Sequence, residues 1–222
     1  MKKFMILVAT LFGIAVVAHA QNTVLDNPSN RAYFGLRGSL DLMFPGDLKT
    51  GNLSVSSFKT APGVELGGIY NVPVKANFYI EPGFKLFYDT YKLKDVSLDF
   101  DDDITYDPKT SVRRFGFRIP VMAGYHFDFN PGVKLHIFTG PEMEVGIWSR
   151  AYENFDDGHQ SENLYGDEGG YNRVDLSWIL GAGISYRHFY FGINGAFGML
   201  DMAKENIKLH ENRLSISLGY NF

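Results

Sequence analysis

The chain has 222 residues, a formal net charge of −4 and no cysteine. This length suits one domain or one barrel, and without cysteine the chain forms no disulfides and carries no lipid on a processed cysteine. The mild acidity argues against nucleic acid as a partner, because its phosphate backbone selects basic surfaces.

Residues 1–20 have the pattern of a secretory signal peptide. Two lysines precede an apolar run over residues 4–17, and an A-x-A cleavage motif ends at Ala20. The run is shorter than the roughly 20 residues that a membrane-spanning helix needs. We expect export and cleavage after Ala20, followed by a flexible periplasmic entry segment over residues 21–30.

From residue 31 to the end, apolar residues recur at every second position, which is the period of a β-strand. In the last nine residues Leu214, Ile216 and Leu218 share one face with Tyr220 and Phe222, and serine, glycine and asparagine take the other. The same pattern predicts eight strands, over residues 32–44, 62–72, 76–93, 111–127, 132–148, 173–187, 188–200 and 211–222.

The connections between these strands alternate in length. Tight ones are expected at residues 73–75, 128–131 and 187–188, and long polar ones at 45–61, 94–110, 149–172 and 201–210. Outer-membrane barrels have short periplasmic turns, long external loops and strands of about 9–11 residues or more. The pattern therefore predicts an all-β, eight-stranded, antiparallel, up-and-down transmembrane β-barrel over residues 31–222.

The polar face decides between a membrane barrel and a soluble lipocalin-type barrel, in which the apolar face would line a pocket. The apolar face lacks charged residues along its core, as lipid requires, because one Lys or Arg at mid-bilayer costs about 2–4 kcal/mol. The polar face mixes small residues with charges of both signs, which suits a narrow lumen. Its expected polar network comprises Arg37, Asp41, Glu65, Glu81, Lys85, Arg118, Glu142, Glu144 and Asp175.

Counting residues along each strand from the tight turns gives their approximate position along the barrel axis, and this predicts particular contacts in the lumen. Arg37 is expected beside Glu65, Glu65 beside Lys85 or Glu81, and Arg118 beside Glu142, because a charge excluded from water must be paired. We expect these side chains to plug the lumen, since eight strands leave little room for a transport pathway.

Aromatic residues gather near the tight turns and the C-terminus, where they predict a girdle at the periplasmic interface. Tyr88, Tyr91 and Trp148 are candidates for the outer girdle. The periplasmic set is Tyr70, Phe78, Tyr125, Phe127, Tyr186, Phe189, Tyr220 and Phe222.

Five stretches, covering roughly residues 31–222, together resemble the outer-membrane-protein β-barrel domain family, whose members are often labelled porin-family proteins. They are FYIEPGFKLFY, FRIPVMAGYHF, VKLHIFTGPEMEVGI, DLSWILGAGISYRHFYFGINGAFGML and NRLSISLGYNF. The resemblance implies an eight-stranded barrel in the bacterial outer membrane and offers no catalytic residues to transfer. Tyr220 and Phe222 resemble the C-terminal aromatic signal read by the barrel-assembly machinery, which implies that machinery and periplasmic chaperones as partners during biogenesis.

The sequence gives little support for lipid hydrolysis or for a specific calcium site. A lipid hydrolase needs a Ser–His pair, and none of His126, His136, His159, His188 and His210 has an obvious serine partner on its strand face. Acidic loop residues offer oxygen ligands for Ca²⁺, but EF-hand spacing is absent and charge runs are usually solvated. They are Asp99, Asp101, Asp102, Asp103, Glu153, Asp156, Asp157, Glu162, Asp167 and Glu168.

Three functions remain open. A non-enzymatic barrel, without a cofactor or metal and monomeric, would use its outer loops to contact lipopolysaccharide, other outer-membrane lipids or external partners, in adhesion or envelope integrity. The alternatives are a narrow porin-like channel for small solutes and a lipid-modifying enzyme. The aromatic residues of the third long loop, among them Tyr165 and Tyr171, suit either partner binding or a loop that folds on its neighbours.

Overall fold

A computed structural model describes residues 31–46, 48–50, 53–55, 58–93, 109–130, 132–155, 158–165, 170–201 and 210–222. The expected signal peptide, the entry segment and the acids of the second long loop lie outside these ranges. Within them, no helix is long and apolar enough to cross a membrane.

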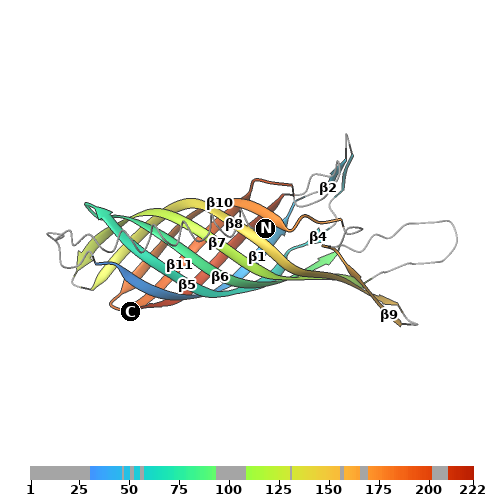
Figure 1. Ribbon diagram of the computed structural model, residues 1–222, viewed down its shortest axis with the longest axis horizontal. Helices are drawn as coiled ribbons and strands as arrows, with labels where there is room; N and C mark the ends of the chain where they lie inside the picture. Colours follow the sequence, from blue (N-terminus) through green and yellow to red (C-terminus); the bar gives the residue numbers. More distant parts are fainter. Residues whose placement is uncertain are drawn as a thin grey trace, which may run out of the picture. The chain divides into compact units, whose positions relative to one another are not determined.

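Eight antiparallel strands close into a barrel (Figure 1). Each strand pairs with the next along the barrel, and the ring closes where the last strand, β12, pairs with β1. The barrel strands are β1 (Tyr33–Pro45), β5 (Ala61–Lys75), β6 (Phe78–Leu93), β7 (Lys109–Asn130), β8 (Val133–Phe155), β10 (Val174–Tyr186), β11 (Phe189–Gly198) and β12 (Glu211–Asn221). The predicted fold class is confirmed.

The strands expose their apolar residues and bury their polar ones, the reverse of a water-soluble barrel. Leu40 is 69% exposed, whereas its neighbour Asp41 is 2% exposed. In β12 the serines Ser215 and Ser217 are buried and Leu218 faces outward. This distribution suits a hydrocarbon environment around the barrel, as the alternation of the sequence predicts.

Tight turns join the strands at one end of the barrel. Ala76 and Asn77, with φ of 47° and 68°, make the two-residue turn between β5 and β6, since two consecutive positive φ values match the twist of a hairpin. The prediction of a turn at residues 73–75 is wrong, because β5 continues through Pro73 with an irregularity in register between Pro73 and Lys75. A bulge is one of the few strand positions that tolerate proline.

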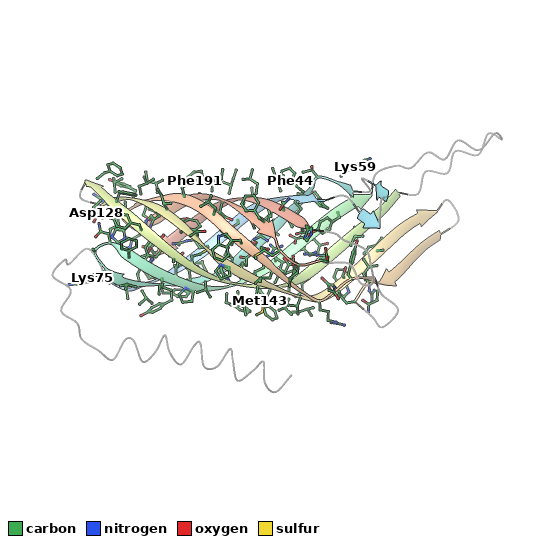
Figure 2. The ribbon with its side chains drawn as sticks, turned by 90° about the horizontal axis from the view of Figure 1, so that it is seen from above. Phe44, Lys59, Lys75, Asp128, Met143 and Phe191 are labelled. Atoms are coloured by element: carbon green, nitrogen blue, oxygen red, sulfur yellow. The ribbon has the colours of Figure 1, made fainter. Side chains whose placement is uncertain are left out.

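The other end of the barrel carries more strand than the sequence predicted. The expected first loop contains β2 (Leu48–Thr50), β3 (Leu53–Val55) and β4 (Phe58–Lys59), and β9 (Gly158–Asn163) pairs with the extended end of β8. Figure 1 shows β9 at this end, and Figure 2 places Lys59 here and Lys75 and Asp128 at the opposite end. β2, β3 and β4 have only two or three residues each, and β9 is polar throughout, so none of them shows the long one-sided alternation of a membrane strand.

Candidate functional site

Arg118 on β7 is the centre of a buried ion-pair network inside the barrel. Its side chain is 0% exposed. Nε donates to Glu144 at 2.7 Å, Nη2 to Asp89 at 2.6 Å, and Nη1 to Glu65 at 2.6 Å and Asp41 at 3.2 Å. These four carboxylates come from β8, β6, β5 and β1, so one guanidinium ties together five strands across the lumen.

Two further arginines extend the network along the barrel axis. Arg114, four residues before Arg118 on the same face of β7, pairs with Glu144 and, at 3.2 Å, with Glu211. Arg213 on β12 pairs with Glu142 and lies 3.5 Å from Glu65. Lys85 contributes a fourth cation, 3.0 Å from Glu65.

Carboxylates outnumber cations in this network. Six carboxylates and four cations give −6 + 4 = −2 as the formal charge of the described network. The acids are Asp41, Glu65, Asp89, Glu142, Glu144 and Glu211, and the cations are Lys85, Arg114, Arg118 and Arg213.

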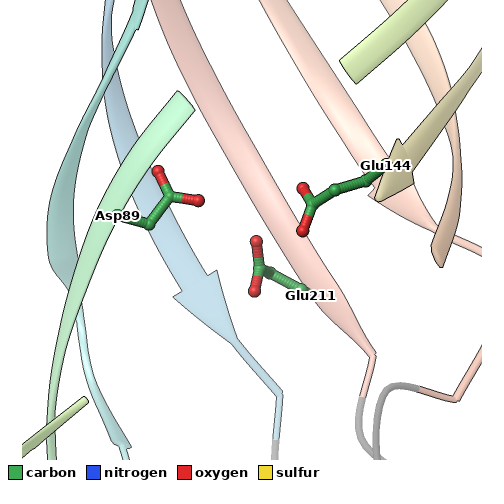
Figure 3. A group of neighbouring side chains, drawn as sticks. All are labelled: Asp89, Glu144 and Glu211. Atoms are coloured by element: carbon green, nitrogen blue, oxygen red, sulfur yellow. The ribbon is translucent and has the colours of Figure 1, made fainter. Parts of the chain in front are cut away.

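Asp89, Glu144 and Glu211 form the part of the network with the geometry of a metal site (Figure 3). One oxygen from each lies within 4.8 Å of the others, and all three side chains are buried. Carboxylate oxygens are hard ligands suited to Ca²⁺ or Mg²⁺. In this structure, however, Arg114 and Arg118 donate to these carboxylates and supply the positive charge that a metal would supply.

An apolar layer lies beside the network, toward the end with the long connections. Tyr91 is buried in this layer, and its hydroxyl donates to Glu211. Tyr165, which follows β9, is 6% exposed and packs against Gly146, where an added Cβ would clash with the tyrosine hydroxyl. Burial raises the pKa of the Tyr165 phenol. For the third long loop, the sequence suited either partner binding or folding on neighbouring residues. Tyr165 folds on its neighbours.

A small cavity lies in the lumen toward the tight turns. Its volume is about 40 Å³, and Arg37, Glu81, Lys85, Tyr190 and Asn194 are among its lining residues. This is room for a few water molecules. The guanidinium carbon of Arg37 lies 4.1 Å from the centre of the Tyr190 ring, the geometry of a cation–π contact.

Comparison with known protein families identifies the fold. The family model described as outer membrane protein beta-barrel domain matches residues 19–204. The chain belongs to this family. Membership confirms the resemblance seen in the sequence and implies a place in the bacterial outer membrane. A comparison with curated proteins gives no match.

Several solved outer-membrane proteins are similar to this family member. Ail, the attachment invasion locus protein of Yersinia pestis, in complex with the heparin analogue sucrose octasulfate, has 16% identity and a TM-score of 0.40, over 86% of this chain and 99% of that chain. Neisserial surface protein A has 13% identity and a TM-score of 0.44, over 86% and 99%. OprG from Pseudomonas aeruginosa has 11% identity and a TM-score of 0.46, over 87% and 97%.

The residues expected in the lumen lie on the inner face of the barrel, but their partners differ in part from those expected. Lys85 pairs with Glu65 as predicted. Within the described residues Arg37 forms no ion pair, because Glu65 lies opposite Ser39 in the register between β1 and β5. Glu81 instead accepts a hydrogen bond of 3.0 Å from Asn71.

The expected pairing of Arg118 with Glu142 is wrong. Arg118 lies opposite Glu144, and Glu142 pairs with Arg213. The reason is the position of the hairpin between β7 and β8: β7 continues to Asn130, which pairs with Val133, so the turn lies later in the chain than expected. Counting from the predicted turn therefore placed Glu142 at the height that Glu144 occupies.

The sequence reading missed four members of the network: Asp89, Arg114, Glu211 and Arg213. The signal was present, since Asp89 lies four residues after Lys85 and Arg114 four residues before Arg118, which in a strand means the same face. All four lie near the long polar connections, at the ends of the predicted strands. It also missed a Ser–His pair, formed by His136 Nε2 and Ser185 Oγ at 2.9 Å on the neighbouring strands β8 and β10.

Aromatic rings form a connected row on the outside of the barrel at the tight-turn end. Phe222 lies 5.0 Å from Tyr220 and 6.0 Å from Phe34, measured between ring centres. Phe189 lies 5.6 Å from Tyr220. The backbone N–H of Phe222 donates to the carbonyl of Phe34 at 2.9 Å, which ties the last residue to β1.

Proposed function

We propose that this protein is a non-enzymatic outer-membrane barrel whose lumen is closed to solutes, and that it acts through its surface-exposed end in adhesion or envelope integrity. The observation that carries the closed lumen is the position of Arg118, which contacts carboxylates from four other strands. A solute would have to break these contacts and leave buried charges unpaired, which costs several kcal/mol per ion.

The proposed surface role is supported by the strand extensions. β7 and β8 have 22 and 23 residues, whereas about 9–11 residues suffice to span the membrane. The additional length carries β9 beyond the barrel (Figure 1). An ordered sheet on this side presents a surface to lipids or to partners outside the cell.

Planar-bilayer recording of the purified, folded protein tests the closed lumen. We expect no stable open steps, because the network spans the lumen. Steps of nanosiemens size would contradict the proposal and favour the second candidate, a narrow channel, for which the cavity beside Arg37 is the supporting observation.

The surface role is tested by deleting the gene and by separately deleting residues 156–163, with adhesion and detergent sensitivity of the cells as readouts. If cells without the gene behave as the parent does in both assays, the surface role is wrong.

The enzyme alternative has one supporting observation, the contact between His136 and Ser185. Both side chains are buried inside the barrel, where a lipid substrate has no access, and the rings that surround His136 are those of Tyr79, His126 and Tyr190. Hydrolysis of labelled phospholipid or lipopolysaccharide by the wild type, lost in Ser185→Ala, would contradict the non-enzymatic proposal.

A further inference from the structure

Two arginines lie directly opposite each other on the outer surface of the barrel. Arg113 on β7 pairs in register with Arg150 on β8, and both side chains are exposed. Like charges at directly opposite positions of a sheet destabilise it. The pair therefore has an electrostatic cost that a bound anion would remove.

The surroundings of the pair provide aromatic rings. The guanidinium of Arg113 lies 4.9 Å from the ring centre of Tyr152, and that of Arg150 lies 5.8 Å from Trp148. Among the side chains that the structure describes, which exclude those of Glu153 and Glu162, neither arginine forms an ion pair with a carboxylate. The flanking residue on β6, opposite Arg113, is the neutral Thr90.

The register also places this pair at a defined height. The next outward-facing pair toward the barrel centre is Phe115 opposite Trp148, at the outer end of the apolar surface. Aromatic rings at that position settle at the membrane interface. Arg113 and Arg150 lie one step beyond, which is the level expected for the phosphate groups of outer-leaflet lipids if the rings mark the interface.

We propose that Arg113 and Arg150 form a binding site for a phosphate group of lipopolysaccharide, the lipid of the outer leaflet. Two guanidinium groups offer paired N–H donors that match the oxygens of a phosphate, and such charge-assisted bonds are stronger than neutral ones. The inference rests on the proposed function only for the barrel's orientation, and it deepens the lipid part of the surface role.

Trp148 gives this site its own reporter. The chain has two tryptophans, so Trp178→Phe leaves Trp148, beside Arg150, as the single emitter. The folded variant in phosphatidylcholine nanodiscs is titrated with phosphorylated lipid A, with dephosphorylated lipid A and with inorganic phosphate. We expect phosphorylated lipid A to shift the Trp148 emission at a concentration at least about tenfold below that of either other probe.

Substitution separates the site from general charge effects. Arg113→Gln and Arg150→Gln should each weaken binding of phosphorylated lipid A about tenfold. Arg187→Gln is the matched control, because Arg187 also lies over an exposed ring, 5.4 Å from Tyr186, but at the opposite end of the barrel. It should leave the affinity unchanged.

Three results would overturn the proposal: equal affinity for both forms of lipid A, equally tight binding of inorganic phosphate, or unchanged affinity in both glutamine variants. If the arginines instead pair with acids of the chain's own loops, the glutamine variants lose stability without losing lipid affinity, which also counts against it. A conducting barrel would contradict the proposed function and leave these results unaffected, so the two failures are distinguishable.

Discussion

Arg118 shows how much one side chain contributes when it is shared by four carboxylates. All four of its partners are buried, so removing the guanidinium leaves negative charges close together in a region with little water. Breaking a buried ion pair by removing one partner costs about 3–5 kcal/mol, more than the intact pair contributes over a hydrophobic replacement.

We therefore expect Arg118→Gln to lower the free energy of unfolding by about 3–5 kcal/mol. Urea unfolding in lipid vesicles, followed by tryptophan fluorescence, measures this. Arg187→Gln, at an exposed turn, should change the free energy by less than about 0.5 kcal/mol. A loss in Arg118→Gln no larger than in this control would show that the network contributes no stability.

At the scale of elements, the described residues after β9 pack on the barrel, with Leu164 and Tyr171 against its buried apolar cluster. Tyr165 packs on Gly146, and Arg173 donates to the Tyr165 carbonyl at 3.2 Å and covers its ring. Local stability of such a segment depends on its buried apolar contacts.

Tyr165→Ala and Gly146→Ala should both release this segment, the first by removing the ring and the second by occupying its place. We expect faster protease cleavage between residues 163 and 173, detected by mass spectrometry, while the barrel itself remains folded. Tyr186→Ala, which removes an exposed ring at the other end, serves as the control. Unchanged cleavage in both variants would show that the ring does not hold the segment.

The last strand ends in Phe222, the residue expected to act as the assembly signal. Its role in assembly can be separated from its contribution to the stability of the folded barrel. Phe222 is 68% exposed, and Phe129, at the same end of the barrel, is 65% exposed. Because the two rings are similarly exposed, removing either should reduce the free energy of unfolding by a similar amount. Only Phe222, however, is expected to be recognised by the assembly machinery.

We expect Phe222→Ala to reduce the amount of folded barrel in cells, measured by the gel shift between folded and heated samples, and Phe129→Ala to leave it unchanged. Purified Phe222→Ala should refold in detergent at the rate of the wild type. Equal amounts of folded protein in the two variants in cells would refute the assembly role.

The strands themselves could be predicted from the sequence because apolar and polar residues alternate along them. One face of each strand meets the apolar surroundings of the barrel, and the other faces the polar lumen. The ion-pair partners could not, because the turn between β7 and β8 lies between Asn130 and Val133, later in the chain than the alternation indicates. The position of this turn decides which residues lie opposite each other, so Arg118 pairs with Glu144, and Glu142 pairs with Arg213. β9 was missed because its sequence, GHQSEN, is polar throughout and has no alternation to read.

For the molecule as a whole, the decisive property is the medium that surrounds it. Leu40 lies near the middle of β1 and is 69% exposed. In lipid, Leu40→Lys should cost about 2–4 kcal/mol, and Leu40→Phe close to nothing. Unfolding of both variants in vesicles measures the difference. Equal stabilities would mean that water, not hydrocarbon, surrounds this face.

The seam between β1 and β12 has a consequence for the order of folding. Ser39 and Ser217, which share a hydrogen bond of 2.9 Å across this seam, are 178 residues apart in the chain. Contacts between such distant residues form slowly, because the entropy of closing the intervening loop must be lost first. Until then both edge strands expose unpaired backbone groups, which hydrocarbon cannot satisfy. The barrel is therefore sealed last, by the strand that is synthesised last.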